Sequence, residues 1–176
     1  MILKTQRLTL RPQAEGDAPA LFRILNDADA MRFWSRPPIT RLEVVEEIVA
    51  EQQAATAAGH CRYWTVLEGP DAIGSVDLSL IQDGAAELGF LFRRDRWGIG
   101  LASEAVSAAI AHAMGPLGLR RLASAIQADN RAASRVLEKN GFSLVDRRQV
   151  TIASGQSRDC AFYLLARDQS AIANGT

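Results

Sequence analysis

The sequence predicts a mixed α/β (α+β) fold in which a central, mostly antiparallel sheet is flanked by helices. Residues 63–67, 73–81 and 86–92 have strand-like apolar patterns and are separated by short turn sequences, which predicts an antiparallel meander. Residues 101–114 then have two adjoining apolar columns at helical spacing, which is typical of a helix packed on a sheet. Because this helix leads to another strand at 121–126, we expect that strand to lie parallel to its neighbour.

Length and composition indicate one globular domain. The chain has 176 residues, of which 48% are hydrophobic and 23% charged, as is usual for soluble proteins. We see no internal repeat and expect a single domain over residues 1–167, followed by a loose tail at 168–176. The 20 Lys and Arg residues balance the 20 Asp and Glu residues, so we expect neither nucleic acid nor a membrane surface as a partner.

The two cysteines, Cys61 and Cys160, are too few for a disulfide framework and lack metal-ligand spacing. We interpret both as reduced thiols and expect no metal. The first residues lead directly into a strand-like pattern, so we expect no signal peptide. No apolar run approaches the ~18 residues that a membrane helix needs. We therefore expect a cytoplasmic protein.

The N-terminal third is predicted to contain one strand and two helices. A strand at 7–12 stops at a proline, and Asp17 is placed to cap a helix over 18–25. The loop 26–38 carries Phe33 and Trp34, and such aromatic side chains either line a pocket or fill the edge of a core.

A second N-terminal helix follows this loop. Thr40 and Glu43 have capping-box spacing and predict a helix that runs to about Ala57. At the other end of the chain, the helical pattern of residues 130–140 stops at Gly141, and residues 142–151 and 160–165 are predicted to form a closing hairpin.

The stretch 87–102 organises the chain. An apolar strand is followed by a basic loop with Arg93, Arg94 and Arg96, then by Gly98 and Gly100, and then by the start of a helix. Glycine allows a tight turn and close approach to a ligand. The helix start adds unpaired N–H groups and the positive end of its dipole. This order predicts a site for phosphate or pyrophosphate. Further basic residues cluster between 131 and 139.

Three segments carry a resemblance to a known family. Trp-Gly-Ile-Gly-Leu-Ala-Ser-Glu-Ala at 97–105, Asn-Arg-Ala-Ala-Ser at 130–134 and Glu-Lys-Asn-Gly-Phe at 138–142 resemble the GNAT superfamily of N-acetyltransferases. Thr-Gln-Arg-Leu-Thr-Leu-Arg-Pro at 5–12 fits the branch that resembles the RimJ/RimL ribosomal-protein N-acetyltransferases. The resemblance covers residues 3–165, which is nearly the whole chain.

The resemblance implies the GNAT acyl-CoA N-acyltransferase fold, whose sheet splays between its fourth and fifth strands. The pantetheine arm of acetyl-CoA would lie in that opening and pair with the fourth strand, and the pyrophosphate would sit on the amides of residues 98–102. Trp97 stands where many members place arginine or glutamine, and Ile99 occupies an often basic position, so the backbone would carry more of the binding. The implied cofactor-binding residues are Phe90, Leu91, Phe92, Arg93, Arg96, Trp97, Gly98, Ile99, Gly100, Leu101, Ala102 and Asn130.

The resemblance also implies catalytic residues. Glu87 occupies a position where many members have a catalytic glutamate, so we expect it to act as the base. Many members use a tyrosine as the acid at the position of Leu137. Ser134 is the substitute that this branch suggests, and water is the alternative. Asn130 would cap its helix, hydrogen-bond the pantetheine arm, or both.

These observations predict an acetyl-CoA-dependent N-acetyltransferase that transfers the acetyl group directly to a primary amine. The favoured acceptor is a protein N-terminal α-amine, with Phe33 and Trp34 on the acceptor side. The alternative acceptor is a small amine, such as a polyamine, an amino acid or an aminoglycoside. A non-catalytic acyl-CoA-binding module is the alternative from another class. Monomer and homodimer are both compatible with the sequence.

Overall fold

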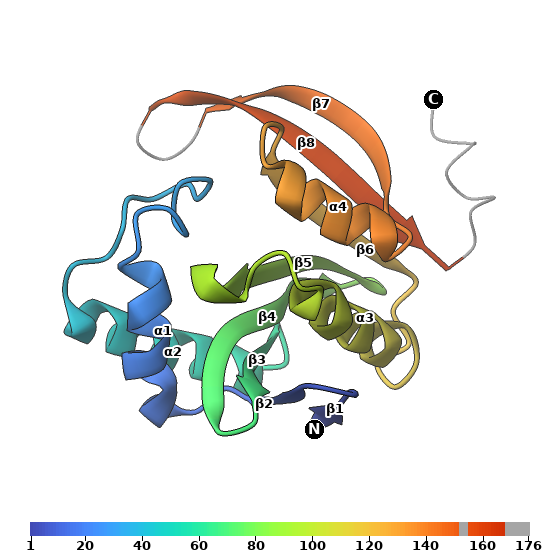
Figure 1. Cartoon of the computed structure of the whole chain (residues 1–176). Coiled ribbons are helices and arrows are strands. Elements are labelled where there is room, and N and C mark those ends of the chain that lie inside the picture. The colour runs from blue at the N-terminus through green and yellow to red at the C-terminus, as the bar shows by residue number, and fades with distance from the viewer. Residues whose placement is uncertain (152–154, 168–176) are drawn as a thin grey trace.

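Eight strands form one sheet in the computed structural model, which describes residues 1–151 and 155–167 (Figure 1). The strand order is β1-β2-β3-β4-β5-β6-β8-β7, and every pair is antiparallel except β5 and β6. The bounds are β1 Leu3–Lys4, β2 Thr9–Pro12, β3 Arg62–Glu68, β4 Asp71–Gln82, β5 Ala85–Phe92, β6 Arg121–Gln127, β7 Ser143–Thr151 and β8 Ser157–Ala166.

The predicted meander and crossover are confirmed. β3, β4 and β5 pair in sequence, and β6 runs parallel to β5 after a helical connection. β7 and β8 form the predicted closing hairpin, with β8 beside β6. The expected tail at 168–176 lies outside the described residues.

Helices cover both faces of the sheet (Figure 1). α3 (Leu101–Met114) packs through Leu101, Ala105 and Val106 on the main core, which includes Val76 and Leu88. α4 (Arg131–Lys139) adds the fully buried Leu137 to the same core. On the opposite face, α1 (Ala18–Leu25) and α2 (Leu42–Ala57) pack against each other through a second apolar cluster. None of the helices in the described ranges is long and apolar enough to span a membrane.

The predicted role of Asp17 as a side-chain cap of α1 is wrong, although the helix begins where expected. Its carboxylate accepts hydrogen bonds from Thr65 Oγ1 at 2.6 Å, from the Ala14 amide at 2.8 Å and from Arg11 Nη1 at 2.8 Å. Burial alone would raise the pKa of Asp17, but these bonds and the charge of Arg11 outweigh it and lower the pKa. Asp17 therefore ties β2 and β3 to the start of α1.

The predicted capping box at Thr40 is also wrong. α2 begins at Leu42 with Arg41 at the N-cap position, and the Arg41 side chain makes no capping hydrogen bond. The helix ends at Ala57 as expected. At α4 the predicted cap is confirmed, because Asn130 Oδ1 accepts from the Ala133 amide at 3.1 Å.

Candidate active site

The sheet opens between its only parallel pair of described strands. β5 and β6 are paired at three positions, Ala85 with Arg121, Ala86 with Leu122 and Glu87 with Ala123. At the next position the buried Ser124 donates from its hydroxyl to the Leu88 carbonyl at 2.9 Å. Beyond it β5 continues along β4, whereas β6 continues along β8. The predicted splay is therefore present. The fourth and fifth strands of the prediction are β5 and β6 here, because the short strand β1 precedes them.

A cleft of about 560 Å³ fills this opening. Its walls come from the end of β5, the turn before α3, β6 and α4. Most of the predicted cofactor-binding residues line it: Phe90, Leu91, Phe92, Arg96, Trp97, Gly98, Gly100, Leu101, Ala102 and Asn130. Among the described residues, the lining does not include Arg93 or Ile99.

The glycine turn at the start of α3 has the geometry that an anion site needs. Gly98 and Gly100 have φ angles of 78° and 86°, which other residues rarely adopt. The Gly100 carbonyl accepts from the Glu104 amide at 3.1 Å, so the amides before Glu104 belong to the unpaired first turn. A Cβ built on Gly98 meets nothing within 4 Å, so a side chain there would project into open space at the cleft. A diphosphate group fits this turn.

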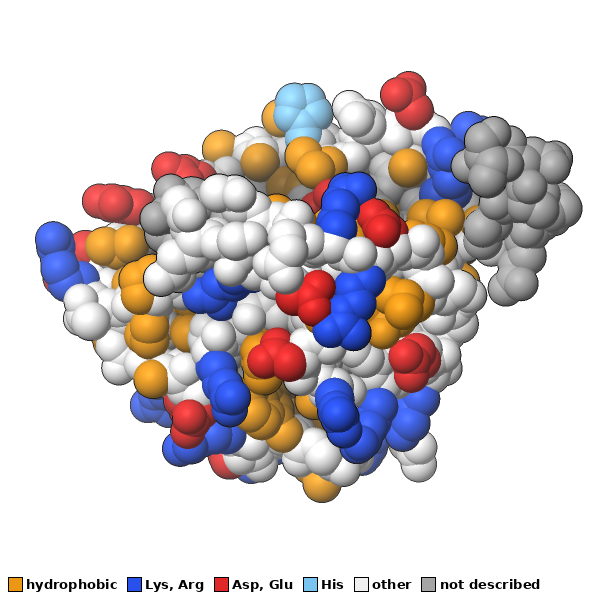
Figure 2. All heavy atoms as spheres, turned by 90° about the horizontal axis from the view of Figure 1, so that it is seen from above, with side chains coloured by type: hydrophobic (Ala, Val, Ile, Leu, Met, Phe, Trp, Pro, Cys, Tyr) orange, Lys and Arg blue, Asp and Glu red, His pale blue; other side chains and the backbone are white. Residues whose placement is uncertain are grey.

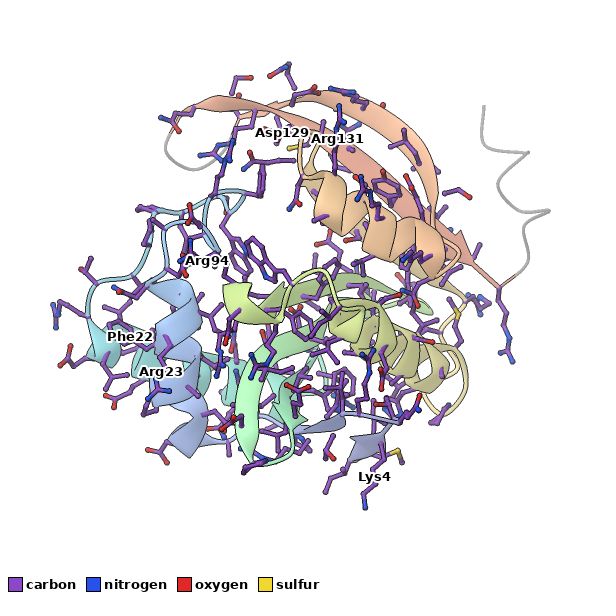
Figure 3. All side chains as sticks on the ribbon, in the orientation of Figure 1. Lys4, Phe22, Arg23, Arg94, Asp129 and Arg131 are labelled. Atoms are coloured by element: carbon purple, nitrogen blue, oxygen red, sulfur yellow. The ribbon has the colours of Figure 1, made fainter. Side chains whose placement is uncertain are left out.

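The arginines before the turn are largely engaged with carboxylates. Arg93 pairs with Asp95 at 2.7 Å, and Arg96 pairs with Glu68 at 2.8 Å and with Asp95 at 2.9 Å. Arg94 extends from the end of β5 toward the loop after α1, where it pairs with Asp27 at 3.5 Å and with Asp29 (Figure 3).

Other basic side chains reach the cleft from its far wall. Arg135 and Lys139 of α4 and Arg158 of β8 line it, and none of the three was among the predicted site residues. The basic cluster between residues 131 and 139 was the sequence signal for the first two. Arg158 lacked such a signal because its position depends on how the closing hairpin pairs with β6.

Phe33 and Trp34 line the cleft beside Ala30 and Ser35. The Trp34 carbonyl accepts from Arg158 Nη1 at 3.3 Å, which joins the loop after α1 to β8. The aromatic loop residues therefore border a pocket, one of the two alternatives left open by the sequence.

The predicted catalytic residues lie outside this lining. Glu87 is exposed and lines a second cavity of about 290 Å³, with Ala123, Arg148 and Phe162. Ser134 is half-buried, and its hydroxyl donates to the Asn130 carbonyl at 3.2 Å. Asn130 itself borders the cleft and caps α4 with its side chain.

The outer face over β7 and β8 mixes both signs of charge with apolar side chains (Figure 2). Arg147 pairs with Asp159 at 2.5 Å, and Arg148 pairs with Asp146 at 2.9 Å. The guanidinium of Arg148 also lies 4.4 Å from the ring centre of Phe162. The lining of the second cavity thus includes the Arg148–Asp146 ion pair and the ring of Phe162 together with Glu87.

Comparison with known proteins identifies the family. A family model described as an acetyltransferase (GNAT) domain matches residues 7–143. The chain belongs to the GNAT acetyltransferases. It is 26% identical to YoaA of Bacillus subtilis, an uncharacterized N-acetyltransferase, over 174 residues that cover 94% of this chain and 97% of YoaA.

Two solved structures show the same fold at low identity. RimL, a ribosomal L7/L12 α-N-protein acetyltransferase in complex with coenzyme A, has a TM-score of 0.85 and 22% identity, with 94% of this chain and 98% of RimL covered. A spermidine N-acetyltransferase from Vibrio cholerae, in complex with CoA and spermine, has a TM-score of 0.81 and 21% identity, with 97% and 100% covered.

One residue of this GNAT fold that pairs with the cleft-lining Gly89 was not predicted from the sequence. Asp77 lies in the middle of β4, where it pairs with Tyr63 on β3 and Gly89 on β5. Burial, with the charge of Glu87, raises the pKa of Asp77 to about 7, and a hydrogen bond from Ser79 opposes the rise. An aspartate between the apolar Val76 and Leu78 of a central strand was the available signal.

Proposed function

We propose that this GNAT enzyme transfers the acetyl group of acetyl-CoA directly to a primary amine, and that a protein N-terminal α-amine is its favoured acceptor. The observation that carries the proposal is the continuous opening between β5 and β6. It runs from the glycine turn at the start of α3 to Leu88, and Ser124 and Ala125, which line it, also border the second cavity that contains Glu87.

The donor suits this opening at both ends. The amides of residues 98–102 would hold the pyrophosphate, and Arg135, Lys139 and Arg158 would add positive charge around the phosphates. The backbone of Phe90 and Phe92 faces the cleft without a strand partner from β6. The Phe92 carbonyl already accepts a hydrogen bond from Trp97 Nε1 at 2.8 Å, so the Phe90 polar groups and the Phe92 amide are the ones that would pair with the pantetheine amides. The CoA bound to RimL supports the same class of donor.

The chemistry requires a neutral amine. Its nitrogen forms a bond to the thioester carbonyl carbon while the carbon–sulfur bond breaks and the thiolate leaves. The amine gives up a proton, for which Glu87 is the proposed acceptor, and the thiolate takes one from Ser134 or from water. An α-amine has a pKa of ~8 and a lysine ~10.4, so deprotonation at pH 7 costs roughly 1 kcal/mol for the first and over 4 for the second. One carboxylate therefore suffices more easily for an α-amine.

The acceptor side favours a polypeptide. Phe33 and Trp34 border the cleft, and Phe162 with Arg148 borders the cavity beside Glu87. A peptide that enters amine-first would have aromatic surfaces on both sides, and the similarity to RimL, an α-N-protein acetyltransferase, supports such an acceptor. The spermidine acetyltransferase favours a small polyamine as the second candidate.

Turnover with a panel of amines tests the proposal. The panel contains peptides with a free N-terminus, the same peptides with a blocked N-terminus, spermidine, an aminoglycoside and free amino acids. We expect acetylation of the free peptides, located at the α-amine by mass spectrometry. Preferred turnover of spermidine or the aminoglycoside would replace the protein acceptor with a small amine. Binding of acetyl-CoA without acetylation of any amine would contradict the proposed reaction.

A further inference from the structure

Asp77 lies on the face of the sheet that is turned toward α1 and α2. Its neighbours Val76 and Leu78 are fully buried against the main core, so Asp77 points to the opposite side. On β5 the same face carries Leu91, which packs against Ile24 and the residues that follow α1. The Asp77 residue is only partly exposed.

The absence of a side chain at Gly89 makes room for the Asp77 carboxylate. A Cβ built on Gly89 would stand 2.5 Å from Asp77 Oδ1, which is closer than real atoms approach. The carboxylate therefore lies directly on the β5 backbone, and Gly89 itself lines the cleft between β5 and β6. No side chain of residue 89 separates Asp77 from the edge of that opening.

Glu87 stands on the same face as Asp77, one step along the ladder. It pairs with Ser79, two residues from Asp77, so the two carboxylates are diagonal neighbours. Glu87 is also the residue at which the pairing of β5 with β6 ends. Glu87 thus stands where the sheet opens, and Asp77 lies on the adjacent strand β4, across from the cleft-lining Gly89.

We propose that Asp77 contacts the acceptor amine and takes its proton, while the carboxylate of Glu87 draws the ammonium group into the opening. This inference rests on the proposed function. It replaces Glu87 as the sole base by two carboxylates that act together, Asp77 as the proton acceptor and Glu87 as the group that attracts the ammonium. The proton moves from the ammonium nitrogen to the Asp77 carboxylate, which becomes a neutral carboxylic acid. The free amine then forms the carbon–nitrogen bond as the carbon–sulfur bond breaks. The nitrogen loses its second proton to water, the thiolate takes a proton from Ser134 or from water, and Asp77 returns the first proton to solvent.

The surroundings of Asp77 suit this role. A carboxylate with a pKa of about 7 is half ionised at neutral pH and is a stronger base than one with an ordinary pKa. Burial, with the charges of Asp77 and Cys61, raises the pKa of Tyr63 to about 12, so its hydroxyl stays neutral. The other charged groups on this face, Arg11 and Asp17, neutralise each other one ladder position away beside Thr65.

The test compares Asp77→Asn, Glu87→Gln and the double variant with Asp71→Asn. Asp71 is the exposed first residue of β4, so it controls for the same substitution in the same strand. Asparagine has the shape of a protonated aspartate, and thermal melting checks that each variant folds. The measurement is kcat against pH, with saturating acetyl-CoA and the best amine of the panel.

We expect the wild-type kcat to rise with pH as a group titrates near 7, and we call this rise the limb of the pH profile. Asp77→Asn should lose this limb and lower kcat about 100-fold. Glu87→Gln should move the limb to lower pH, because it removes the charge that raises the pKa of Asp77. The double variant should lose little more than the worse single variant, since the pair acts as one unit. Asp71→Asn should match wild type.

An Asp77→Asn enzyme with the wild-type limb and kcat within twofold of Asp71→Asn overturns the inference. Fully additive losses in the double variant also overturn it. If Asp77→Asn does not fold, Glu87→Gln decides, and a limb that stays in place refutes the pair. A wild-type chain that acetylates no amine refutes the proposed function, and this inference with it. If the wild type is active and Asp77→Asn changes neither kcat nor its pH profile, only the inference about Asp77 is refuted and the proposed function stands.

Discussion

Arg7 and Glu104 form an ion pair that joins the N-terminal segment to the first turn of α3. Arg7 Nη2 and Nε lie 2.7 Å from Glu104 Oε2, and the Arg7 amide donates to Oε1 at 2.9 Å. Arg7 Nη1 also donates to the Ile99 carbonyl at 3.0 Å, between the two glycines of the turn. The pair therefore holds the backbone that would carry the pyrophosphate.

Removal of this pair should weaken donor binding. We expect Arg7→Ala to lower the affinity for acetyl-CoA about three- to tenfold, because the Ile99 carbonyl loses its donor and the turn gains freedom. Calorimetric titration measures the change. Arg41→Ala is the matched control, since Arg41 pairs with Glu43 at 3.4 Å on the exposed surface. Equal affinities for both variants would exclude a positioning role for Arg7.

A side chain at the glycine turn should block the donor outright. We expect Gly100→Glu to abolish acetyl-CoA binding in the same titration, because a carboxylate at the N-terminus of α3 would occupy and repel the phosphate position. Gly59→Glu controls for strain, since Gly59 also has a positive φ, 84°, and open space around its Cα. If Gly100→Glu binds acetyl-CoA with unchanged affinity, the pyrophosphate does not bind at this turn.

Glu87 should contribute to turnover and little to donor binding. We expect Glu87→Gln to lower kcat by roughly 10²–10⁴ and to leave the affinity for acetyl-CoA nearly intact. Glu87 lines the second cavity and not the cleft, which is the reason for this separation. Besides the rise of kcat that Asp77 sets at lower pH, part of the lost activity should return at high pH, where the amine deprotonates unaided. Steady-state kinetics at pH 7 and 9 measure both effects, with the exposed Glu43→Gln as the control.

Apart from the two-residue strand β1, which was not predicted, the sequence was sufficient for the order of the strands and α-helices because the patterns that define them are local. The turn sequence between β4 and β5 and the glycines at 98 and 100 each act within a few residues, and they predicted the meander and the cleft turn. The Asn130 cap was predicted for the same reason. The cap at Asp17 failed because tertiary partners decide a carboxylate's bonds: Asp17 accepts from Arg11 and Thr65 and not from the free end of α1. The cap at Thr40 failed because α2 begins later, at Leu42, with Arg41 at the N-cap position.

The non-local part of the site could not be predicted from the sequence. Asp77 gains its environment from Gly89 and Glu87, which face it only because of the register between β4 and β5. Arg158 reaches the cleft only because β8 lies between β6 and β7. Register and strand order depend on packing over the whole sheet, so a residue's neighbours across strands are not determined by spacing along the chain.

Asp77 should reduce the stability of the fold at neutral pH. Its pKa is about 7 when folded and ~3.9 when unfolded, so the folded chain binds more protons between these values. Stability should therefore fall as pH rises from 4 to 7. Each kcal/mol gained raises the melting temperature of a chain of this size by about 2–4 °C, so we expect Asp77→Asn to melt several degrees above wild type at pH 8 and close to it at pH 4. A difference that does not vary with pH would contradict the raised pKa.

His112 should give the stability of the fold the opposite pH dependence from that of Asp77. Its side chain is buried in α3, its ring meets Trp64 edge-on at 5.6 Å, and Nδ1 has no hydrogen-bond partner in the described part of the chain. Burial and the charges of the N-terminal amine and Arg62 lower the pKa of His112. The unfolded chain therefore binds the proton first, and stability should fall as pH drops below the unfolded value of ~6.5.

His112→Phe removes this titration and keeps an aromatic ring against Trp64. Because Asp77 titrates with the opposite sign in an overlapping range, the comparison is made in the Asp77→Asn background. We expect the melting temperature of Asp77→Asn to fall between pH 6.5 and 4.5, and that of the double variant to fall less. His60→Phe is the control, since His60 is exposed. Equal slopes for the His112 and His60 variants would contradict the lowered pKa of His112.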